Sequence, residues 1–281
     1  MMRIIAEAEG KLMKIGMLQT HVYEDKIKNL DEAAEYAGLA VERGAETVIL
    51  PEMFNCPYET EKFPLYAEER GGTSYNALSA IAKENGIYVV GGSIPEREGE
   101  RLYNTCFIFD PAGNEIAKHR KAHLFDISIE GKQSFKESDT FTPGDDLCLF
   151  EAAGHKFGVA ICFDIRFPEY FRDLVLRGAE AILVPAAFNM TTGPLHWELS
   201  FRMRAVDNQC YTVGVAPARA RNGKYVSFAN SIACDPWGHV LVNAGEEAGV
   251  SIMEFDSELV KSVRAQLPIL SARRPELYFL K

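Results

Sequence analysis

The sequence predicts an α/β domain in which mixed β-sheets carry helices on their outer faces. Two observations support this fold class. Segments with helical spacing alternate with short apolar segments in both halves of the chain, and hairpin-like turns such as 235–238 (DPWG) join neighbouring strands. An ordinary three-layer doubly wound sheet is the second choice. No GxGxxG motif follows the first expected strand, which argues against a nucleotide-binding version of that fold.

The expected elements follow from apolar spacing and from the residues that end each segment. In 25–43, for example, Ile27, Leu30 and Ala34 lie on one helical face and Gly44 ends the segment. The expected helices are 25–43, 74–85, 165–176, 195–208 and 257–266. The expected strands are 14–19, 47–50, 87–94, 103–109, a segment ending near 119, 157–161, 181–184, 211–216, 227–233, 239–243 and 249–255. Loops or turns are expected at 55–64, 96–101, 121–144 and 185–194, and an extended tail after the last helix.

We expect a single domain. The chain has 281 residues, which is within range for one large α/β domain, and it contains no internal repeat or low-complexity linker. Residues 1–12 are expected to form an N-terminal extension, because the first strand pattern begins just after Met13. The domain is expected to span 13–281, with a C-terminal helix and tail over about 255–281.

Composition excludes several classes of partner. A net charge of −10 argues against a nucleic-acid surface and against anionic membranes, and no apolar run approaches the length of a membrane span. The six cysteines are dispersed without a CxxC pair, and the six histidines show no HxH or HExxH spacing. We therefore expect no disulfide framework, no metal, no cofactor and a reducing, cytoplasmic location.

A cysteine in the middle of the chain lies where a nucleophile is often held. The apolar run 157–161 stops at Cys162, Pro168 suits a first helical turn, and Gly178 suits the end of that helix. A cysteine on a sharp strand-to-helix turn would lie at the rim of a sheet with its sulfur exposed, as a nucleophile requires. From this stretch alone, a buried packing cysteine is an equally good interpretation.

Other strand ends carry complementary chemistry. Glu52 follows the strand 47–50, Lys121 follows the strand that ends near 119, and the loop 185–194 follows another. Ligands of open α/β sheets bind beyond the carboxyl ends of strands. A thiol, a carboxylate and an ammonium at such positions are the parts of a cysteine hydrolase that uses no catalytic histidine.

Three segments resemble the signature segments of the nitrilase superfamily of carbon–nitrogen hydrolases, in order and in spacing. They are LPEMF at 50–54, HRKAHLFD at 119–126 and ICFDIRFPE at 161–169. The resemblance covers the chain from about Met13 onward. It implies a four-layer α-β-β-α sandwich in which Glu52 is the general base and acid, Lys121 stabilises the oxyanion and Cys162 is the nucleophile. Glu137, in FKES, matches a further glutamate of the family that positions the lysine or the incoming water.

Finer segments resemble the omega-amidases, which hydrolyse the side-chain amide of 2-oxo acids such as 2-oxoglutaramate and 2-oxosuccinamate. These segments are NCPY (55–58), HLFDI (123–127), FTPGD (141–145), FNMTTGPLHWE (188–198) and RAVDNQ (204–209). The resemblance implies that a small amide is cleaved through a thioester to a dicarboxylate and ammonia. Phe163 stands where tyrosine is commoner, and only its backbone N–H is expected to line the oxyanion hole. The alternatives are a deaminated-glutathione amidase, an N-carbamoyl amino acid amidohydrolase and a non-enzymatic scaffold of the same fold.

Several side chains near these motifs are candidates for binding the substrate. Arg166, Tyr58, Thr191 and Thr192 offer a cation and hydroxyls for a substrate carboxylate. Phe125 and Met190 offer apolar walls, and a place in the core is an equally good interpretation for both. An ion pair of Arg166 with Asp164 or Glu169 is an equally good interpretation, because buried arginines are normally paired. The family also implies a homodimer or higher homo-oligomer, packed through the 165–176 helix and the C-terminal tail.

Overall fold

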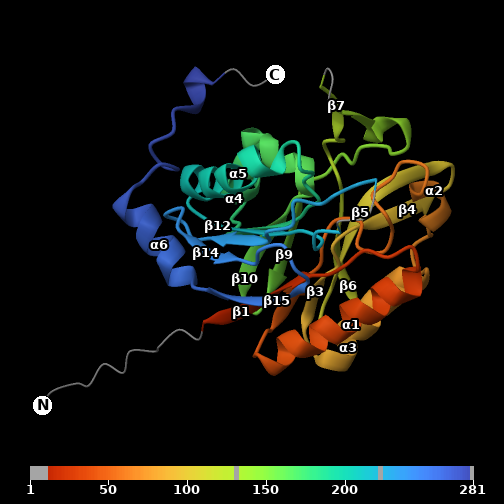
Figure 1. Ribbon diagram of the computed structural model, residues 1–281. Coiled ribbons are helices and arrows are strands. Elements are labelled where there is room, and N and C mark those ends of the chain that lie inside the picture. The colour runs from red at the N-terminus through yellow and green to blue at the C-terminus, as the bar shows by residue number, and fades with distance from the viewer. Residues whose placement is uncertain (1–11, 130–132, 221–223, 279–281) are drawn as a thin grey trace, which may run out of the picture.

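Two mixed sheets stack face to face between two layers of helices (Figure 1). The structure is a computed structural model that describes residues 12–129, 133–220 and 224–278. Its layer order, helix–sheet–sheet–helix, confirms the predicted fold class. Residues 1–11 of the expected N-terminal extension lie outside the described residues. The first strand begins at Met13.

The first sheet has a parallel centre with antiparallel strands on both sides. β1, β2 and β3 run parallel, β15 pairs antiparallel with β1, and β5 pairs antiparallel with β3, β4 and β6. Its strands are β15 (Gly249–Phe255), β1 (Met13–Gln19), β2 (Thr47–Ile49), β3 (Tyr88–Val90), β5 (Arg101–Phe109), β4 (Ile94–Glu98) and β6 (Glu115–Arg120).

Helices α1 (Lys26–Glu42) and α3 (Thr73–Asn85) cover the outer face of this sheet (Figure 1). α1 begins where the Asp25 carboxylate accepts the N–H of Ile27 at 2.9 Å, which satisfies a backbone donor that the first helical turn leaves unpaired. Gly16 in β1 lets α1 approach closely, because a Cβ there would lie 2.8 Å from Ala40 Cβ. The outer layer is therefore held by small residues on both sides of the contact.

The second sheet repeats this plan. β10, β11 and β12 are parallel, and β9, β13 and β14 are antiparallel additions. Its strands are β14 (Val240–Asn243), β13 (Ile232–Cys234), β12 (Tyr211–Val215), β11 (Ala181–Pro185), β10 (His155–Val159) and β9 (Cys148–Ala152). The helices α4 (Pro168–Leu176) and α5 (Gly193–Asn208) cover its outer face, and α6 (Ser257–Gln266) follows β15 along the edge (Figure 1).

Aromatic side chains fill the space between the two sheets. Phe255 of the first sheet contacts Phe157 and Tyr211 of the second, with ring centroids 5.4 and 5.1 Å apart. Each of these three side chains is at most 2% exposed. This contact fixes how the sheets face each other, and thereby how their strand ends meet.

The middle of the chain contains more structure than the pattern predicted. The expected strand 87–94 is two strands, β3 and β4, because Gly92 adopts a φ of +58° and a Cβ there would lie 2.2 Å from the carbonyl oxygen of Pro51. The expected turn 96–101 is shortened, since β4 continues to Glu98. Glu96 is buried there and binds Arg120 and Thr105 on neighbouring strands, each at 2.7 Å.

Three further segments differ from the predictions. The expected loop 121–144 contains a hairpin of β7 (Asp126–Ile129) and β8 (Gln133–Lys136) and a 3-10 turn (Glu137–Asp139), because Asp126 accepts the Ser138 N–H and hydroxyl at 3.0 and 2.6 Å. β9 was not predicted, and α2 (Phe63–Tyr66) lies at the end of the expected loop 55–64.

Other element boundaries shift by a few residues. The expected helix 165–176 begins only at Pro168, after a 3-10 turn (Cys162–Arg166). The expected strand 227–233 is reduced to β13, since Ala229 and Asn230 adopt positive φ values. The extended tail includes a 3-10 turn (Pro275–Leu277).

The Phe255 contact gives a test of the two-sheet architecture. We expect Phe255→Ala to lower the free energy of unfolding by about 3–5 kcal/mol, because it leaves a cavity between the sheets. Leu241→Ala, at a side chain that is 47% exposed on β14, is the control and should cost less than about 0.5 kcal/mol. Urea denaturation measures both, and a loss below about 1 kcal/mol for Phe255→Ala would contradict this packing.

Candidate active site

Glu52 is brought between the sheets by a sharp turn after β2. Met53, the next residue, adopts a φ of +51°, which is uncommon for a residue with a side chain. The Ser93 hydroxyl holds the turn by accepting the Met53 N–H at 3.1 Å. Glu52 is completely buried as a result.

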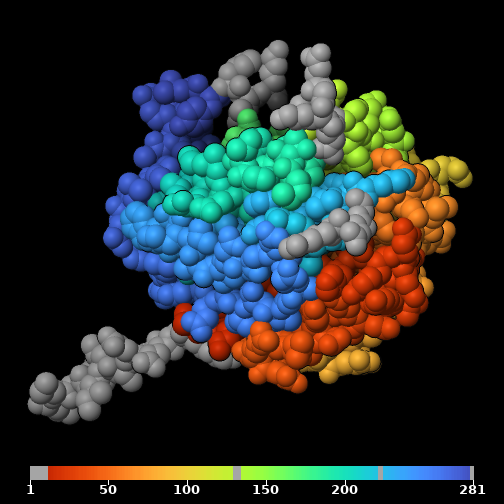
Figure 2. Space-filling view, viewed as in Figure 1, coloured from red at the N-terminus to blue at the C-terminus, as the bar shows by residue number. Residues whose placement is uncertain are grey.

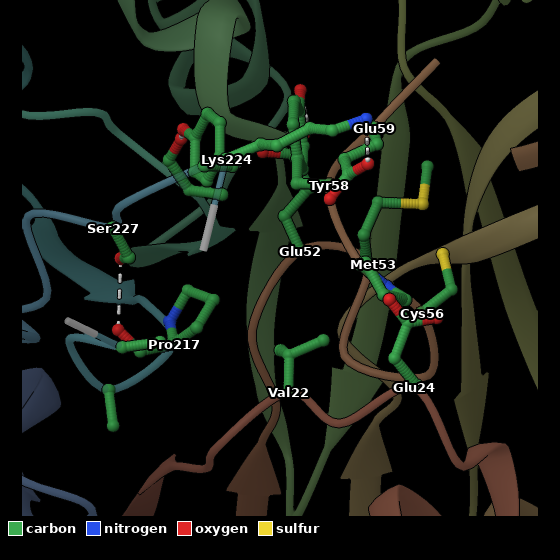
Figure 3. A pocket seen from close by; sticks show the side chains of 15 residues that line it. Val22, Glu24, Glu52, Met53, Cys56, Tyr58, Glu59, Pro217, Lys224 and Ser227 are labelled. Atoms are coloured by element: carbon green, nitrogen blue, oxygen red, sulfur yellow. Dashed lines mark hydrogen bonds and ion pairs between the residues drawn. The ribbon is translucent and has the colours of Figure 1, made fainter. Parts of the chain in front are cut away.

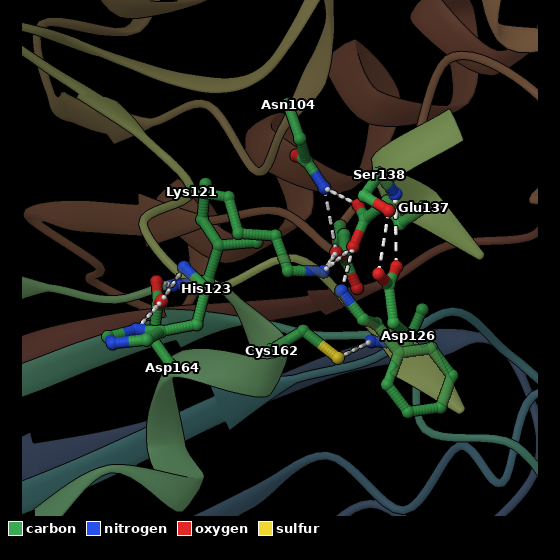
Figure 4. A network of polar contacts seen from close by, with 12 residues as sticks. Asn104, Lys121, His123, Asp126, Glu137, Ser138, Cys162 and Asp164 are labelled. Atoms are coloured by element: carbon green, nitrogen blue, oxygen red, sulfur yellow. Dashed lines mark hydrogen bonds and ion pairs between the residues drawn. The ribbon is translucent and has the colours of Figure 1, made fainter. Parts of the chain in front are cut away.

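Lys121 approaches Glu52 from the end of β6. Its ammonium donates to Glu52 Oε1 at 2.8 Å and to Glu137 Oε2 at 2.7 Å, and all three side chains are completely buried (Figure 4). Glu137 comes from the 3-10 turn after β8 and also accepts the Phe125 N–H at 2.6 Å. We call Glu52, Lys121 and Glu137 the charge cluster.

Asn104 completes the charge cluster and was not singled out in the sequence. Its side-chain amide donates to Glu52 Oε1 at 2.8 Å and to Glu137 Oε1 at 3.0 Å (Figure 4). The signal was present, since Asn104 is a lone amide within the mostly apolar strand β5 and is 1% exposed. A buried polar side chain needs hydrogen-bond partners, so such a position indicates a polar site.

The charge cluster changes the acidity of its members. Burial raises the pKa of Glu52; the Lys121 ammonium lowers it in part and the Glu137 carboxylate raises it further. Burial alone would lower the pKa of Lys121, but Glu137 and Glu52 outweigh that effect and hold it well above its usual range. Lys121 therefore stays positively charged, while Glu52 can take up a proton more readily than an exposed glutamate.

Cys162 lies at the start of the 3-10 turn, three residues after β10 ends at Val159. It has a φ of +44°, and its Sγ accepts the Ala187 N–H at 3.5 Å. The expectation of an exposed sulfur was wrong, because the residue is only 5% exposed beneath the segment that follows β11. Burial raises the pKa of the Cys162 thiol; Glu52 raises it further and Lys121 opposes this. The thiol is therefore protonated at neutral pH.

Asp164 ties the cysteine turn to the lysine segment. Its carboxylate accepts the Ile161 N–H at 2.9 Å and lies 3.1 Å from His119 Nε2 and 2.7 Å from His123 Nδ1 (Figure 4). His119 and His123 flank Lys121 in the sequence, so one buried carboxylate fixes the two segments relative to each other. The spacing of the histidines did not indicate this structural role. No cluster of three or more His, Cys, Asp or Glu in the described ranges is arranged to hold a metal.

Arg166 forms neither of the ion pairs that the alternative interpretation offered. Asp164 is taken up by the histidines, and within the described part of the chain Arg166 forms no ion pair. Its guanidinium lies 3.1 Å from His196 Nδ1 and over the ring of Phe188, 5.0 Å from the ring centroid. The interpretation as an ion pair with Asp164 or Glu169 was therefore wrong.

A small cavity brings several predicted residues together beside Cys162. Its volume is only about 10 Å³, which is room for about one water, and its lining includes Phe125, Cys162, Phe163, Arg166, Phe188 and Thr192. We call it the arginine cavity. Met190 is 42% exposed and Thr191 is half-buried, and neither lines this cavity. Tyr58 lies on the other side of Glu52, with its hydroxyl 3.4 Å from Glu52 Oε1.

The charge cluster predicts a large stability effect. We expect Lys121→Met to lower the free energy of unfolding by about 3–5 kcal/mol, because two buried carboxylates lose their counter-ion. Lys121→Met/Glu137→Gln should recover part of this loss, since one carboxylate is also removed. Urea unfolding of the single and double variants measures the coupling. A cost below about 1 kcal/mol for Lys121→Met, or a double variant as unstable as the sum, would contradict the geometry.

Comparisons with known proteins show the family of this chain. The family model described as carbon–nitrogen hydrolase matches residues 14–265. Omega-amidase NIT2 of Xenopus tropicalis is 46% identical over 265 residues, which cover 94% of this chain and 96% of that protein. Human omega-amidase NIT2 is 42% identical over the same shares of the two chains.

Solved structures give the same result. The crystal structure of Saccharomyces cerevisiae Nit3, a member of branch 10 of the nitrilase superfamily, is similar with a TM-score of 0.86 and 36% identity, covering 95% of this chain and 97% of that chain. A Nesterenkonia amidase, solved as a glutamate and cysteine double mutant with acrylamide, has a TM-score of 0.79 and 25% identity, covering 96% and 97%. This chain therefore belongs to the carbon–nitrogen hydrolase family of the nitrilase superfamily.

Proposed function

We propose that this protein is an omega-amidase that hydrolyses the terminal carboxamide of a small 2-oxo acid to a dicarboxylate and ammonia. The observation that carries the proposal is Arg166, which lies without an ion pair among the described residues in the same small cavity as Cys162. A cation beside the nucleophile suits a substrate that carries a carboxylate a few atoms from its amide. The 42–46% identity with proteins named omega-amidase supports the same substrate class.

Acylation follows from the protonation states in the site. Glu52 removes the proton of the Cys162 thiol as the sulfur attacks the amide carbonyl, because the raised pKa of the thiol disfavours a preformed thiolate. The developing oxyanion is stabilised by the Lys121 ammonium and the backbone N–H of Phe163. Each such donor contributes about 3 kcal/mol to lowering the barrier. Glu52 then gives its proton to the departing ammonia, and a thioester remains on Cys162.

Deacylation uses the same groups in reverse. Glu52 removes a proton from water, the water oxygen attacks the thioester carbonyl, and the C–S bond breaks. The thiol regains its proton from Glu52 and the dicarboxylate is released. Glu137 acts as a positioning residue in both halves, since it holds the Lys121 ammonium at 2.7 Å.

The arginine cavity supports a short substrate over a long one. Its volume of about 10 Å³ lies far below the 300–1,000 Å³ that is usual for drug-sized ligands, so each further atom of a substrate has to displace side chains. A deaminated glutathione would have to extend well beyond it, and an N-carbamoyl amino acid would place its carboxylate closer to the reacting carbon. Thr192 lies in the same lining as Arg166 and offers a hydroxyl to the substrate carboxylate.

Three further expectations remain proposals. We propose a homodimer or higher oligomer, supported by exposed apolar side chains on α5 and the tail, among them Leu195, Leu199 and Leu277 at 72%, 67% and 64% exposure. A monomeric mass in sedimentation equilibrium would refute it.

The six free cysteines support a cytoplasmic location, which cell fractionation tests. A single cooperative unfolding transition would support one domain over 13–281. No helix among the described residues is long and apolar enough to cross a membrane.

A substrate panel tests the activity. We expect ammonia release from 2-oxoglutaramate with a kcat/KM at least tenfold above the values for deaminated glutathione and N-carbamoyl amino acids. Cys162→Ala should abolish turnover, and Glu52→Gln should lower kcat at least about 100-fold, as is usual for a lost general base. Cys234→Ala, at a buried cysteine in β13, is the control and should retain activity. Turnover by Cys162→Ala would refute the mechanism.

Arg166→Met tests carboxylate recognition. We expect KM for 2-oxoglutaramate to rise about ten- to hundredfold with a smaller change in kcat, because a charge-assisted hydrogen bond contributes about 1.5–3 kcal/mol. Hydrolysis of a neutral amide such as butyramide should change less than threefold. Arg202→Met removes a surface arginine of α5 and is the matched control. An equal loss on both substrates would show that Arg166 has only a structural role.

A further inference from the structure

The segment that covers Cys162 is itself supported by a later part of the chain. Residues 225–228, which follow β12, form an antiparallel bridge with residues 187–189. Beside this bridge the Phe228 N–H donates to the Phe188 carbonyl oxygen at 2.7 Å. We call residues 225–228 the supporting segment. It is the direct neighbour of the residues that lie over the nucleophile.

The supporting segment is held on two sides. The Ser227 hydroxyl donates to the Pro217 carbonyl oxygen and accepts the Ala229 N–H, each at 3.0 Å (Figure 3). At the surface, Lys224 precedes the supporting segment and joins it to the segment after β2 by an ion pair with Glu61 at 2.8 Å (Figure 2). The supporting segment can therefore hold other residues in place.

Tyr225 binds the residue whose N–H reaches the sulfur. The Tyr225 hydroxyl donates to the Ala187 carbonyl oxygen, and the Ala187 N–H donates to Cys162 Sγ at 3.5 Å. Because peptide units are planar, only the φ and ψ angles of Ala187 separate its N–H from its carbonyl. The hydroxyl of Tyr225 thus limits how far the Ala187 N–H can turn away from the sulfur.

The ring of Tyr225 makes a second contact with the site. It lies against the ring of Tyr58, with centroids 4.7 Å apart, and the Tyr58 hydroxyl lies 3.4 Å from Glu52 Oε1 (Figure 3). Tyr225 therefore touches the proton-transfer side of the site with its ring and the nucleophile side with its hydroxyl. Tyr225→Phe separates the two contacts, because it removes only the hydroxyl.

We propose that Tyr225 is a positioning residue that holds the Ala187 N–H on the sulfur of Cys162 and so assists the attack of the thiol. The proposal rests on the proposed role of Cys162 as the nucleophile. In the attack the thiol proton passes to Glu52 and the C–S bond forms. Tyr225 keeps its own proton throughout.

The physical reason is the charge that develops on the sulfur. A hydrogen bond to the charged form of a group favours that form over the neutral one. Burial and the Glu52 carboxylate raise the pKa of the Cys162 thiol, whereas the Lys121 ammonium and the Ala187 N–H lower it. A donor that stays aligned therefore makes the thiol easier to deprotonate within a buried site.

Alkylation of Cys162 by iodoacetamide, a neutral reagent, tests the proposal across a range of pH. We expect Tyr225→Phe to slow alkylation about three- to tenfold at neutral pH and to move its rise to higher pH, as the loss of one neutral hydrogen bond implies. Mass spectrometry of the Cys162 peptide assigns the reaction. With an amide substrate, kcat should fall by a similar factor and KM should change less than twofold.

The other groups around the sulfur are unchanged in this variant, so the shift reports the contact with Ala187. The titratable and charged groups that face Cys162 come from the turn after β2, the end of β6, the 3-10 turn and the segment 55–64. They are Glu52, Lys121, Arg166 and Tyr58.

Two further variants complete the test. Tyr36→Phe removes a hydroxyl from α1, in the outer helix layer, and should leave the alkylation profile and kcat unchanged. Ser227→Ala loosens the supporting segment at Pro217 and should move the alkylation profile in the same direction as Tyr225→Phe, but by less. It also repeats the test should Tyr225→Phe fold poorly.

Alkylation profiles that coincide with the wild type in both variants, or that move to lower pH, would overturn the proposal. A higher KM with an unchanged kcat in Tyr225→Phe would also overturn it, because the hydroxyl would then act on the substrate. Alkylation needs no amide substrate. Failure of the wild type to cleave 2-oxoglutaramate would therefore refute the proposed function and leave this test in place.

Discussion

The buried Lys121 ammonium between two carboxylates is the interaction on which the rest of the site depends. Removing three charged groups from water is costly, and the cost is offset only when their geometry and their remaining hydrogen bonds are good. Asn104 and the Phe125 N–H supply those bonds. The charge cluster therefore needs β5, β6 and the β7–β8 hairpin in place together.

The active site forms where the fold brings the ends of strands from both sheets together. Phe255 and its partners fix the two sheets, and the ends of β2, β6 and β10 then deliver a carboxylate, an ammonium and a thiol to one point. The turns that position the Glu52 carboxylate and the Cys162 thiol contain residues with positive φ, Met53 and Cys162. Backbone strain of this kind persists only where the surrounding structure holds it, as Ser93 and Asp164 do here.

The sequence was informative about the reacting groups and less so about what holds them. Glu52, Lys121 and Cys162 could be found because each follows an expected strand, and Glu137 because it resembles a family position. Asn104 and the Asp164–histidine contacts could not, since they depend on which strands become neighbours across long stretches of chain.

The errors in the predictions have the same origin. Glu96 resembled a turn residue because its cross-strand partners Arg120 and Thr105 are invisible in a local pattern. Two carboxylates, Asp164 and Glu169, lie near Arg166 in the sequence. Asp164, however, pairs with histidines from another segment. The local sequence thus identified Arg166 as a candidate site residue, but it did not show which residues Glu96 and Arg166 contact.

The charge cluster tunes the acidity of the buried Glu52. Glu137 raises the pKa of Glu52, so Glu137→Gln should lower it, while Lys121, Asn104, Tyr58 and Cys162 still face the carboxylate.

The most direct measurement is the pH dependence of kcat/KM, whose acid limb reports a base that must be deprotonated in the free enzyme. The acid limb should lie above the usual range of a glutamate in the wild type and move to lower pH in Glu137→Gln. Asp139→Asn removes an exposed carboxylate from the same 3-10 turn as Glu137 and should leave the acid limb in place. An acid limb that stays unchanged or moves to higher pH in Glu137→Gln would show that Glu137 does not raise the pKa of Glu52.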